Sequence, residues 1–99
     1  MMKVVTICGS MKFASQMKDI AANLELQHKY VVFQCVYVDS STKLSENEIL
    51  ILNNIHKRKI EICDAIYVVN IQGYIGHTTK EEIAYAKQIG KEVLYHEQL

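Results

Sequence analysis

Asp64-Ala65-Ile66-Tyr67-Val68-Val69-Asn70 is the stretch that decides the fold. Its centre is an unbroken run of β-branched, aromatic and small apolar residues, which is typical of a strand. A strand whose apolar residues do not alternate with polar ones is buried on both faces, as in a parallel sheet covered by helices. Residues 64–70 therefore predict a buried strand of an α/β domain.

The segments before this strand predict two further strands and a helix between them. Val4 to Cys8 is a β-branched run that Gly9-Ser10 interrupts, and Tyr30 to Val38 is a second such run without a helical period. Between them, from Met11 to about Gln27, the spacing of apolar residues is helical. The apolar stripe consists of Phe13, Met17, Ile20, Ala21 and Leu24.

A second helix begins after a polar loop over residues 39–43. Ser45 and Glu48 have the spacing of a capping box, with Ser45 at the N-cap. The helix then runs to about Ile62. Its apolar positions include Ile49, Ile51, Leu52, Ile55 and Ile62.

The last part of the chain predicts one more helix and one more strand. Thr78 or Thr79 caps a helix that runs through Ile89, and Gly90 ends it in the C′ position. Glu92 to Tyr95 is the fourth strand.

The order of elements is thus strand, helix, strand, helix, strand, helix, strand. Such alternation predicts a parallel sheet with helices on both faces, which is a three-layer α/β sandwich. Right-handed crossovers favour the strand order 2-1-3-4 of Rossmann-like and flavodoxin-like folds. The 99 residues fit a single domain over residues 1–99.

The charge composition argues against a nucleic-acid partner and favours self-association. Lys plus Arg and Asp plus Glu number 11 each, so the formal net charge is zero. A nucleic-acid interface would need a basic surface, so we expect no nucleic-acid partner. Low net charge leaves little repulsion between copies, which favours a homodimer or a higher homo-oligomer.

The chain also lacks the signals of a membrane or secreted protein. No apolar run is long enough to span a bilayer, and the N-terminal residues predict a strand instead of a signal peptide. The three cysteines, Cys8, Cys35 and Cys63, are odd in number and include no C-x-x-C pair, so we expect buried free thiols. These features favour a location in the cytoplasm and argue against a membrane partner.

In an open parallel sheet, ligands bind at the carboxyl ends of the strands where the strand order reverses. For the order 2-1-3-4 this point lies between the loops at residues 8–11 and 70–79. The two loops contain every glycine except Gly90. We therefore expect the functional site there.

Two turns in these loops have both a structural and a functional interpretation. Gly9-Ser10 either binds an anion at a helix N-terminus or is a tight turn capped by Ser10. Gly73-Tyr74-Ile75-Gly76 either approaches a ligand, with Tyr74 as a stacking wall or lid, or is an ordinary loop. No G-x-G-x-x-G motif or Walker A lysine is present, so we expect no dinucleotide or other cofactor.

Glu82 is a carboxylate that can face the expected crevice. In the first turn of the last helix it could act as a nucleophile or base. Thr79 with Glu82, or Thr78 with Glu81, could equally form a capping box, and only one of these registers is possible.

The four histidines give weaker signals. His77 borders the glycine loop and could touch a ligand, whereas His28 and His96 lie near element ends and are expected to be exposed. His56 lies on a helix, where a surface or packing role is commoner than catalysis. No pair has the spacing of metal ligands, so the sequence predicts no metal site.

Several stretches in this order resemble the nucleoside 2-deoxyribosyltransferase-like superfamily, which includes the 2′-deoxynucleoside 5′-phosphate N-hydrolases. The similarity covers nearly the whole chain. The matching stretches are Val4-Val5-Thr6-Ile7-Cys8-Gly9-Ser10, His56 to Asn70, Gly73-Tyr74-Ile75-Gly76, Glu82-Ile83-Ala84-Tyr85-Ala86 and Gly90-Lys91-Glu92-Val93.

The resemblance implies a Rossmann-like sheet, an oligomer and a small-molecule nucleoside or nucleotide as substrate. It makes Glu82 the nucleophile that attacks the sugar C1′, after which water or a second nucleobase takes the sugar. It places Cys8-Gly9-Ser10 near the nucleotide and its 5′-phosphate. It also selects the register in which Thr78 and Glu81 form the cap.

The chain departs from this family at two acidic positions. The transferases have an Asp six residues before the nucleophile, where this chain has Gly76, and Asn70 is the nearest counterpart of an Asp beside the third strand. His56 or His77 could supply the missing acid. The chain is also shorter than most relatives by about one strand. Hydrolysis, transfer and non-catalytic nucleotide binding or sensing all remain open from the sequence.

Overall fold

The computed structural model describes residues 1–39 and 41–98 of the chain. Over these residues a four-stranded parallel sheet has the order β2-β1-β3-β4, as the sequence predicted. The strands are β1 (Val4–Gly9), β2 (Val31–Phe33), β3 (Ala65–Val69) and β4 (Glu92–Tyr95). The helices are α1 (Ala14–Leu26), α2 (Glu46–Ile62) and α3 (His77–Gln88), with short 3-10 turns at Met11–Phe13 and Ile71–Gly73.

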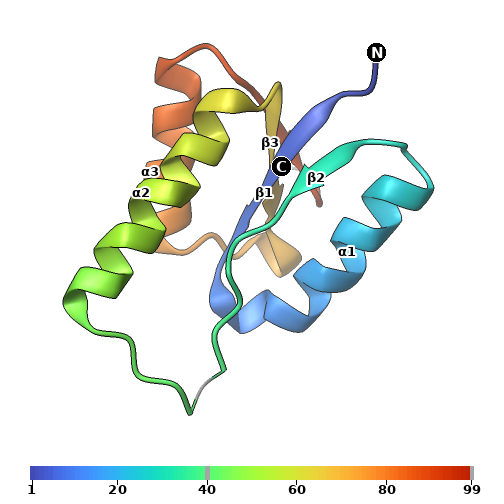
Figure 1. Cartoon of the computed structure of the whole chain (residues 1–99). Coiled ribbons are helices and arrows are strands. Elements are labelled where there is room, and N and C mark those ends of the chain that lie inside the picture. The colour runs from blue at the N-terminus through green and yellow to red at the C-terminus, as the bar shows by residue number, and fades with distance from the viewer. Residues whose placement is uncertain (40, 99) are drawn as a thin grey trace.

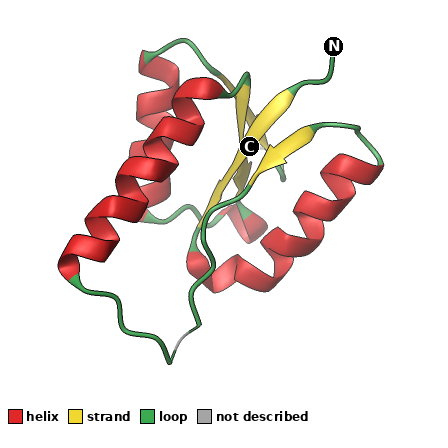
Figure 2. Ribbon diagram, viewed as in Figure 1, coloured by secondary structure: helices red, strands yellow, loops and turns green. Residues whose placement is uncertain are grey.

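The helices cover both faces of the sheet, so the predicted three-layer α/β fold is confirmed. Helix α1 lies on one face, and α2 and α3 lie side by side on the other (Figures 1 and 2). On the α1 face, Ile7 of β1 packs with Met17. On the opposite face, Cys8 of the same strand packs with Ile60 of α2 and Ile83 of α3.

Strands β1 and β3 form the centre of the sheet. Their register runs from Val5 opposite Ala65 to Gly9 opposite Val69, so their carboxyl ends are level. All residues of β3 are buried except the half-buried Tyr67. This burial confirms the strand predicted from the apolar run at residues 64–70 and sets the switch point beside Gly9.

The first helix begins with a short turn that the sequence did not predict. Residues Met11–Phe13 form a 3-10 turn, and the regular α-helix starts only at Ala14. The Ser10 hydroxyl caps this turn by accepting a hydrogen bond from the Lys12 N–H at 3.3 Å. The predicted apolar stripe is confirmed, because Phe13, Met17, Ala21 and Leu24 are buried and Ile20 packs beside them.

Strand β2 is shorter than predicted. The sequence predicted residues 30–38, whereas only Val31–Phe33 pair with β1. β2 is an edge strand, and beyond Phe33 the chain leaves the sheet, where the Lys59 ammonium donates a hydrogen bond to the Gln34 carbonyl at 2.5 Å. The β-rich composition of residues 34–38 instead reflects packing, since Cys35 and Tyr37 lie against the Ile7 and Met17 cluster.

Helix α2 begins at the predicted capping box. The Ser45 hydroxyl accepts from the Glu48 N–H, and the Glu48 carboxylate accepts from the Ser45 N–H. The helix buries Ile60 but leaves Ile49, Leu50, Ile51, Ile55 and Ile62 exposed. Within the described residues, no helix is both long and apolar enough to cross a membrane.

Helix α3 begins earlier than predicted. Its N-cap is Gly76, so neither Thr78 nor Thr79 caps it and neither proposed capping box forms. Glu82 consequently lies in the second turn instead of the first. The C-terminal prediction is confirmed, because Gly90 has φ +78°, in the left-handed region that favours glycine.

Candidate active site

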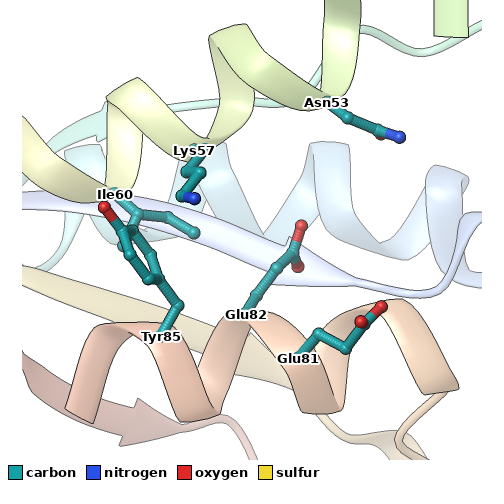
Figure 3. Close-up of a pocket in the computed structure, with 6 residues that line it drawn as sticks. All are labelled: Asn53, Lys57, Ile60, Glu81, Glu82 and Tyr85. Atoms are coloured by element: carbon teal, nitrogen blue, oxygen red, sulfur yellow. The ribbon is translucent and has the colours of Figure 1, made fainter. Parts of the chain in front are cut away.

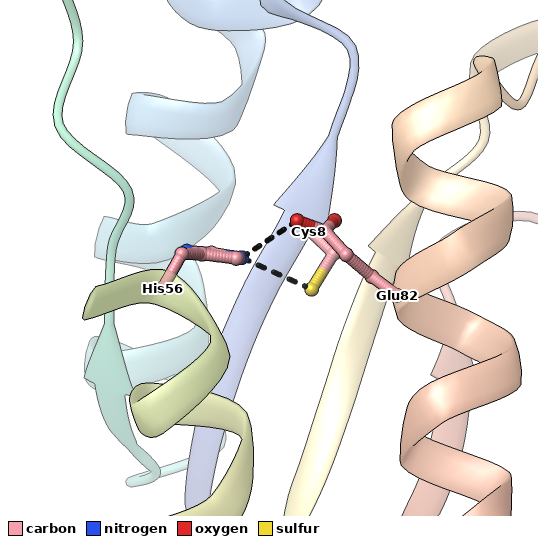
Figure 4. Close-up of side chains that lie close together, drawn as sticks. All are labelled: Cys8, His56 and Glu82. Atoms are coloured by element: carbon pink, nitrogen blue, oxygen red, sulfur yellow. Dashed lines mark hydrogen bonds and ion pairs between the residues drawn. The ribbon is translucent and has the colours of Figure 1, made fainter. Parts of the chain in front are cut away.

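Three side chains from three different elements meet at the carboxyl end of β1. His56 of α2 lies with its Nε2 atom 3.5 Å from the Cys8 Sγ and 3.4 Å from a Glu82 carboxylate oxygen (Figure 4). The His56 and Glu82 side chains are only 13% and 20% exposed. The sheet contributes the thiol, and the two helices that cover this face contribute the imidazole and the carboxylate.

The environment of Glu82 favours its protonated form. Burial raises the pKa of the Glu82 carboxyl from 4.5 to about 7, and the charge of Glu81 acts in the same direction. Hydrogen bonding from the Cys8 thiol opposes this rise in pKa. A carboxyl with such a pKa exchanges protons near neutral pH, which suits a nucleophile or an acid–base group.

His56 is held neutral. Burial, together with the Lys59 ammonium, lowers the pKa of the His56 imidazole to about 4. Its Nδ1 atom is buried and has no hydrogen-bond partner in the described part of the chain. At neutral pH the uncharged ring therefore interacts with its neighbours only through Nε2, where it can donate to an ionised Glu82.

Cys8 is unsuited to nucleophilic catalysis here. The thiol is 1% exposed, and burial raises its pKa well above the ordinary value of 9.0. In a thiol–imidazole–acid triad the thiol and the acid contact opposite ring nitrogens. In this cluster both Cys8 and Glu82 approach Nε2 of His56. The geometry thus leaves Glu82 as the candidate nucleophile.

Glu82 lines two pockets. A small pocket of about 60 Å³ lies at the end of β1, and its lining includes Cys8, Gly9, Met11, Cys35, His56 and Glu82. A larger pocket of about 270 Å³ lies between α2 and α3. In Figure 3, Asn53 and Lys57 project from α2 and Glu81 and Glu82 project from α3 around this larger pocket. Glu82 is therefore accessible from both sides.

A third pocket of about 270 Å³ lies at the predicted switch point. Its lining comprises Gly9, Ser10, Met11, Tyr74, Gly76, His77, Thr78 and Thr79. It shares Gly9 and Met11 with the small pocket, which in turn shares Glu82 with the larger one. We call these three adjoining pockets the crevice. Tyr74 forms an outer wall, with its ring packed edge-on against Phe13 at 5.9 Å.

Two of the predicted binding residues do not reach this crevice. Asn70 is 1% exposed, and its side-chain amide is bonded on both sides to the backbone of Glu97, at 2.9 and 2.8 Å. Gly73 has φ +78° in an exposed 3-10 turn and lines none of the three pockets. Both residues shape the chain around the site.

Gly9 has a packing reason to be glycine as well as a place in the crevice. A Cβ atom there would lie 3.1 Å from the Met17 sulfur and 3.1 Å from the Val69 Cβ. Such distances are tighter than ordinary contact, so the Met17 or Val69 side chain would have to shift to make room for a Cβ atom.

Sequence reasoning missed several residues of the site. Lys57 was not singled out as a site residue in the sequence, yet it lines the larger pocket with its ammonium 4.5 Å from the centre of the Tyr85 ring. Asn53 also lines that pocket and lies three residues before His56 on the same helix, which is a usable signal. Cys35 is half-buried at the small pocket, whereas Cys8 and Cys63 are buried as predicted.

The sequence matches no model of a known protein family, and no curated protein matches it. Among solved structures, the chain is similar to a conserved protein from Enterococcus faecalis V583, with a TM-score of 0.65 and 13% identity. The similarity covers 96% of this chain and 63% of that protein, so this chain spans less than two thirds of its length. At this identity the likeness supports the α/β fold alone.

Proposed function

We propose that the protein cleaves the N-glycosidic bond of a nucleoside or its 5′-monophosphate, with Glu82 as the nucleophile. The observation that carries this proposal is the position of the Glu82 carboxylate. It lines both the small pocket at the end of β1 and the larger pocket between α2 and α3, and its pKa of about 7 makes both protonation states accessible. The resemblance noted in the sequence assigns the same residue.

The proposed chemistry proceeds in two steps. The ionised Glu82 carboxylate forms a bond to C1′ of the sugar as the C1′–N bond breaks and the base leaves with the electron pair. Water then attacks C1′ and releases Glu82, and the proton that this water loses balances the one that the departed base takes up. Neutral His56 orients the carboxylate through Nε2, which lies 3.4 Å from it. Because the pKa of His56 is about 4, the ring carries no extra proton at neutral pH and does not act as a general acid.

The switch-point pocket suits a 5′-phosphate. Gly76 caps α3 without a side-chain acceptor, so the first N–H groups of this helix are available to an anion. Ser10 lines the same pocket, and the Lys12 ammonium lies 3.5 Å from the centre of the Tyr74 ring at its wall. The phosphate then lies on this side of Glu82, and the base lies toward the larger pocket, where the Asn53 amide can bond its edge.

Base release measures the proposed activity directly. We expect free base to appear when the protein is incubated with a panel of nucleosides and 5′-monophosphates. Glu82→Ala should lower the rate by about 10³-fold or more, because the nucleophile is lost. Glu82→Gln is the matched variant of equal size and should be equally inactive. Base release that persists in both variants would contradict the assignment.

Two further variants test the arrangement of the subsites. Ser10→Ala should raise KM for a 5′-monophosphate several-fold but leave KM for the nucleoside unchanged. Asn53→Ala should raise KM for both. If ligands stabilise the protein against heat without any base release, the protein is instead a nucleotide-binding or sensing module.

We also propose that a second copy of the chain covers α2. Ile51, Ile55 and Ile62 lie within about 40° of one another around the helix axis, and all are about half exposed. This stripe is on the opposite side of α2 from the buried Ile60, so the helix has two apolar faces. The zero net charge of the chain offers no electrostatic barrier to such self-association.

The proposed reaction belongs in a reducing compartment such as the cytoplasm. Cys8, Cys35 and Cys63 are all free thiols. Cys8 contacts His56 inside the crevice, so its oxidation would introduce a bulky or charged group beside Glu82.

A further inference from the structure

Cys8, His56 and Glu82 are arranged as ligands are arranged around an ion. Their ligand atoms all lie within 4.8 Å of one another, and each comes from a different element of the fold. The thiol and the carboxylate both converge on Nε2 of His56, at 3.5 and 3.4 Å, as Figure 4 shows. The paired distances can therefore be compared with the edges of a coordination polyhedron.

The observed distances fit a tetrahedral zinc ion. With Zn–S near 2.3 Å and Zn–N and Zn–O near 2.0–2.1 Å, tetrahedral angles put sulfur and nitrogen about 3.5 Å apart and nitrogen and oxygen about 3.4 Å apart. Two of the three edges thus already have the required length. The third edge, between the Cys8 sulfur and a Glu82 oxygen, is no longer than 4.8 Å.

The donor set selects the kind of ion. Magnesium and calcium prefer shells made wholly of oxygen, whereas a thiolate, an imidazole and a carboxylate together suit zinc and its neighbours in the first transition series. The three side chains are buried or largely buried, so few water molecules compete with them for the ion. A thiolate and a carboxylate also neutralise the charge of a divalent ion.

We propose that Cys8, His56 and Glu82 form a zinc-binding site with three protein ligands. The fourth position faces the pocket of about 60 Å³, where Met11 and Cys35 lie and where one water molecule fits. Structural zinc centres usually have four protein ligands, whereas sites with three protein ligands keep one position open. Residues from three elements are needed, which explains why no ligand spacing is visible along the sequence.

The environment of His56 limits the affinity of this site. A zinc-bound histidine usually donates its other ring N–H to an oxygen, and loss of that partner weakens binding about 10–100-fold. Nδ1 of His56 has no partner in the described part of the chain. The site therefore binds zinc more weakly than a structural zinc centre and exchanges it with solution.

Zinc binding does not depend on the proposed reaction. If both hold, the ion occupies the Glu82 carboxylate and inhibits base release, and a chelator restores it. Direct measurement of the bound metal separates the two proposals. If the protein releases base but binds no metal, only the zinc site is overturned. If it binds metal but releases no base, even with a chelator present, only the reaction is overturned.

Cobalt is the probe for this site, because a Co²⁺–thiolate bond gives a charge-transfer absorption that Co²⁺ bound to exposed histidines lacks. Reduced, metal-free protein should show this absorption, saturate at one equivalent of Co²⁺ and lose the signal when Zn²⁺ is added. Cys8→Ser should abolish the absorption, and His56→Gln and Glu82→Gln should each weaken binding at least about tenfold. Each variant is first checked for cooperative unfolding without metal.

Cys63→Ser is the matched control, since it removes a buried thiol that lines none of the three pockets. It should keep the absorption and the stoichiometry. No thiolate absorption in the unaltered protein would overturn the proposal. So would an unchanged spectrum in Cys8→Ser, or an equal loss in Cys63→Ser.

Discussion

The two faces of the sheet differ in the ionisable groups that they bury, although the same strand contributes to both. Ile7 of β1 is fully buried against Met17 and Ala21 of α1, in a cluster of apolar side chains. Cys8, the next residue, is equally buried but points to the other face, toward His56 and Glu82. Ile7 also lines the small pocket, but its side chain packs toward α1 whereas that of Cys8 points toward His56 and Glu82, because successive side chains of a strand alternate between faces.

The helices on the two faces differ in the same way. α1 presents one apolar stripe to the sheet and a mostly polar surface outward, which is the pattern of a helix that only packs. α2 and α3 instead bring a histidine and a glutamate inside, although burial of ionisable groups is unfavourable. The α1 face is therefore apolar throughout, whereas the α2 and α3 face combines an apolar cluster with ionisable groups whose burial is unfavourable.

The largest expected effect separates the neighbours Ile7 and Cys8. Ile7→Ala should lower the free energy of unfolding by about 2–5 kcal/mol, because it leaves a cavity in a fully packed cluster. Cys8→Ala removes a single sulfur and should cost only about 1 kcal/mol. Urea unfolding followed by circular dichroism measures both losses.

The functional readouts should show the reverse order. Ile7→Ala should keep cobalt binding and base release per folded molecule, whereas Cys8→Ala should lose the cobalt–thiolate absorption. Ile7→Val, with an expected loss of about 0.5–1.5 kcal/mol, keeps the comparison available if Ile7→Ala does not fold. Equal losses of stability at the two positions would break the contrast between the faces.

The second effect is a pH dependence above pH 4.5 that comes from the buried Glu82 and His56 on the α2 and α3 face. The folded pKa of Glu82 is raised from 4.5 to about 7, so the folded protein binds the extra proton and stability falls as pH rises through that range. The folded pKa of His56 is lowered from 6.5 to about 4, so stability rises with pH from 4 to 6.5. In the unaltered protein the two slopes oppose each other between pH 4.5 and 6.5.

Single variants should reveal each slope. Above pH 4.5, Glu82→Gln should remove the fall due to Glu82 and keep the rise due to His56, and His56→Gln should do the reverse, each effect amounting to about 3 kcal/mol. Urea unfolding at a series of pH values measures them. If Glu82→Gln had the same profile as the unaltered protein, the buried carboxyl would not titrate as its environment requires.

The smallest effect on stability concerns the outer surface of α2. Ile55→Lys should place a charge in the apolar stripe and make the protein monomeric, while changing the stability of the monomer by no more than about 0.5 kcal/mol. Sedimentation velocity at several concentrations measures the association. Asn23→Lys, on the exposed face of α1, adds the same charge and should leave the association unchanged. A monomer in the unaltered protein would refute self-association through α2.

Most of the fold could be predicted from local sequence, but two boundaries could not. The apolar runs of β1 and β3, the capping box at Ser45 and the glycine after α3 each specify their element locally. The end of β2 depends on where an edge strand leaves its only partner, and this is a tertiary property. The start of α3 was misplaced because Gly76 caps the helix through its backbone, whereas the threonines offered a stronger sequence signal.

The sequence by itself determined the parallel sheet, its order and the location of the crevice, because strand runs, helix periodicity and crossover handedness are written in local patterns. It also named Glu82, although not its surroundings. Only the tertiary structure decided that Cys8, His56 and Glu82 meet. Their separation depends on how α2 and α3 settle against β1, and that packing is fixed by contacts between residues far apart in the chain, such as Cys8 with Ile60 and Ile83.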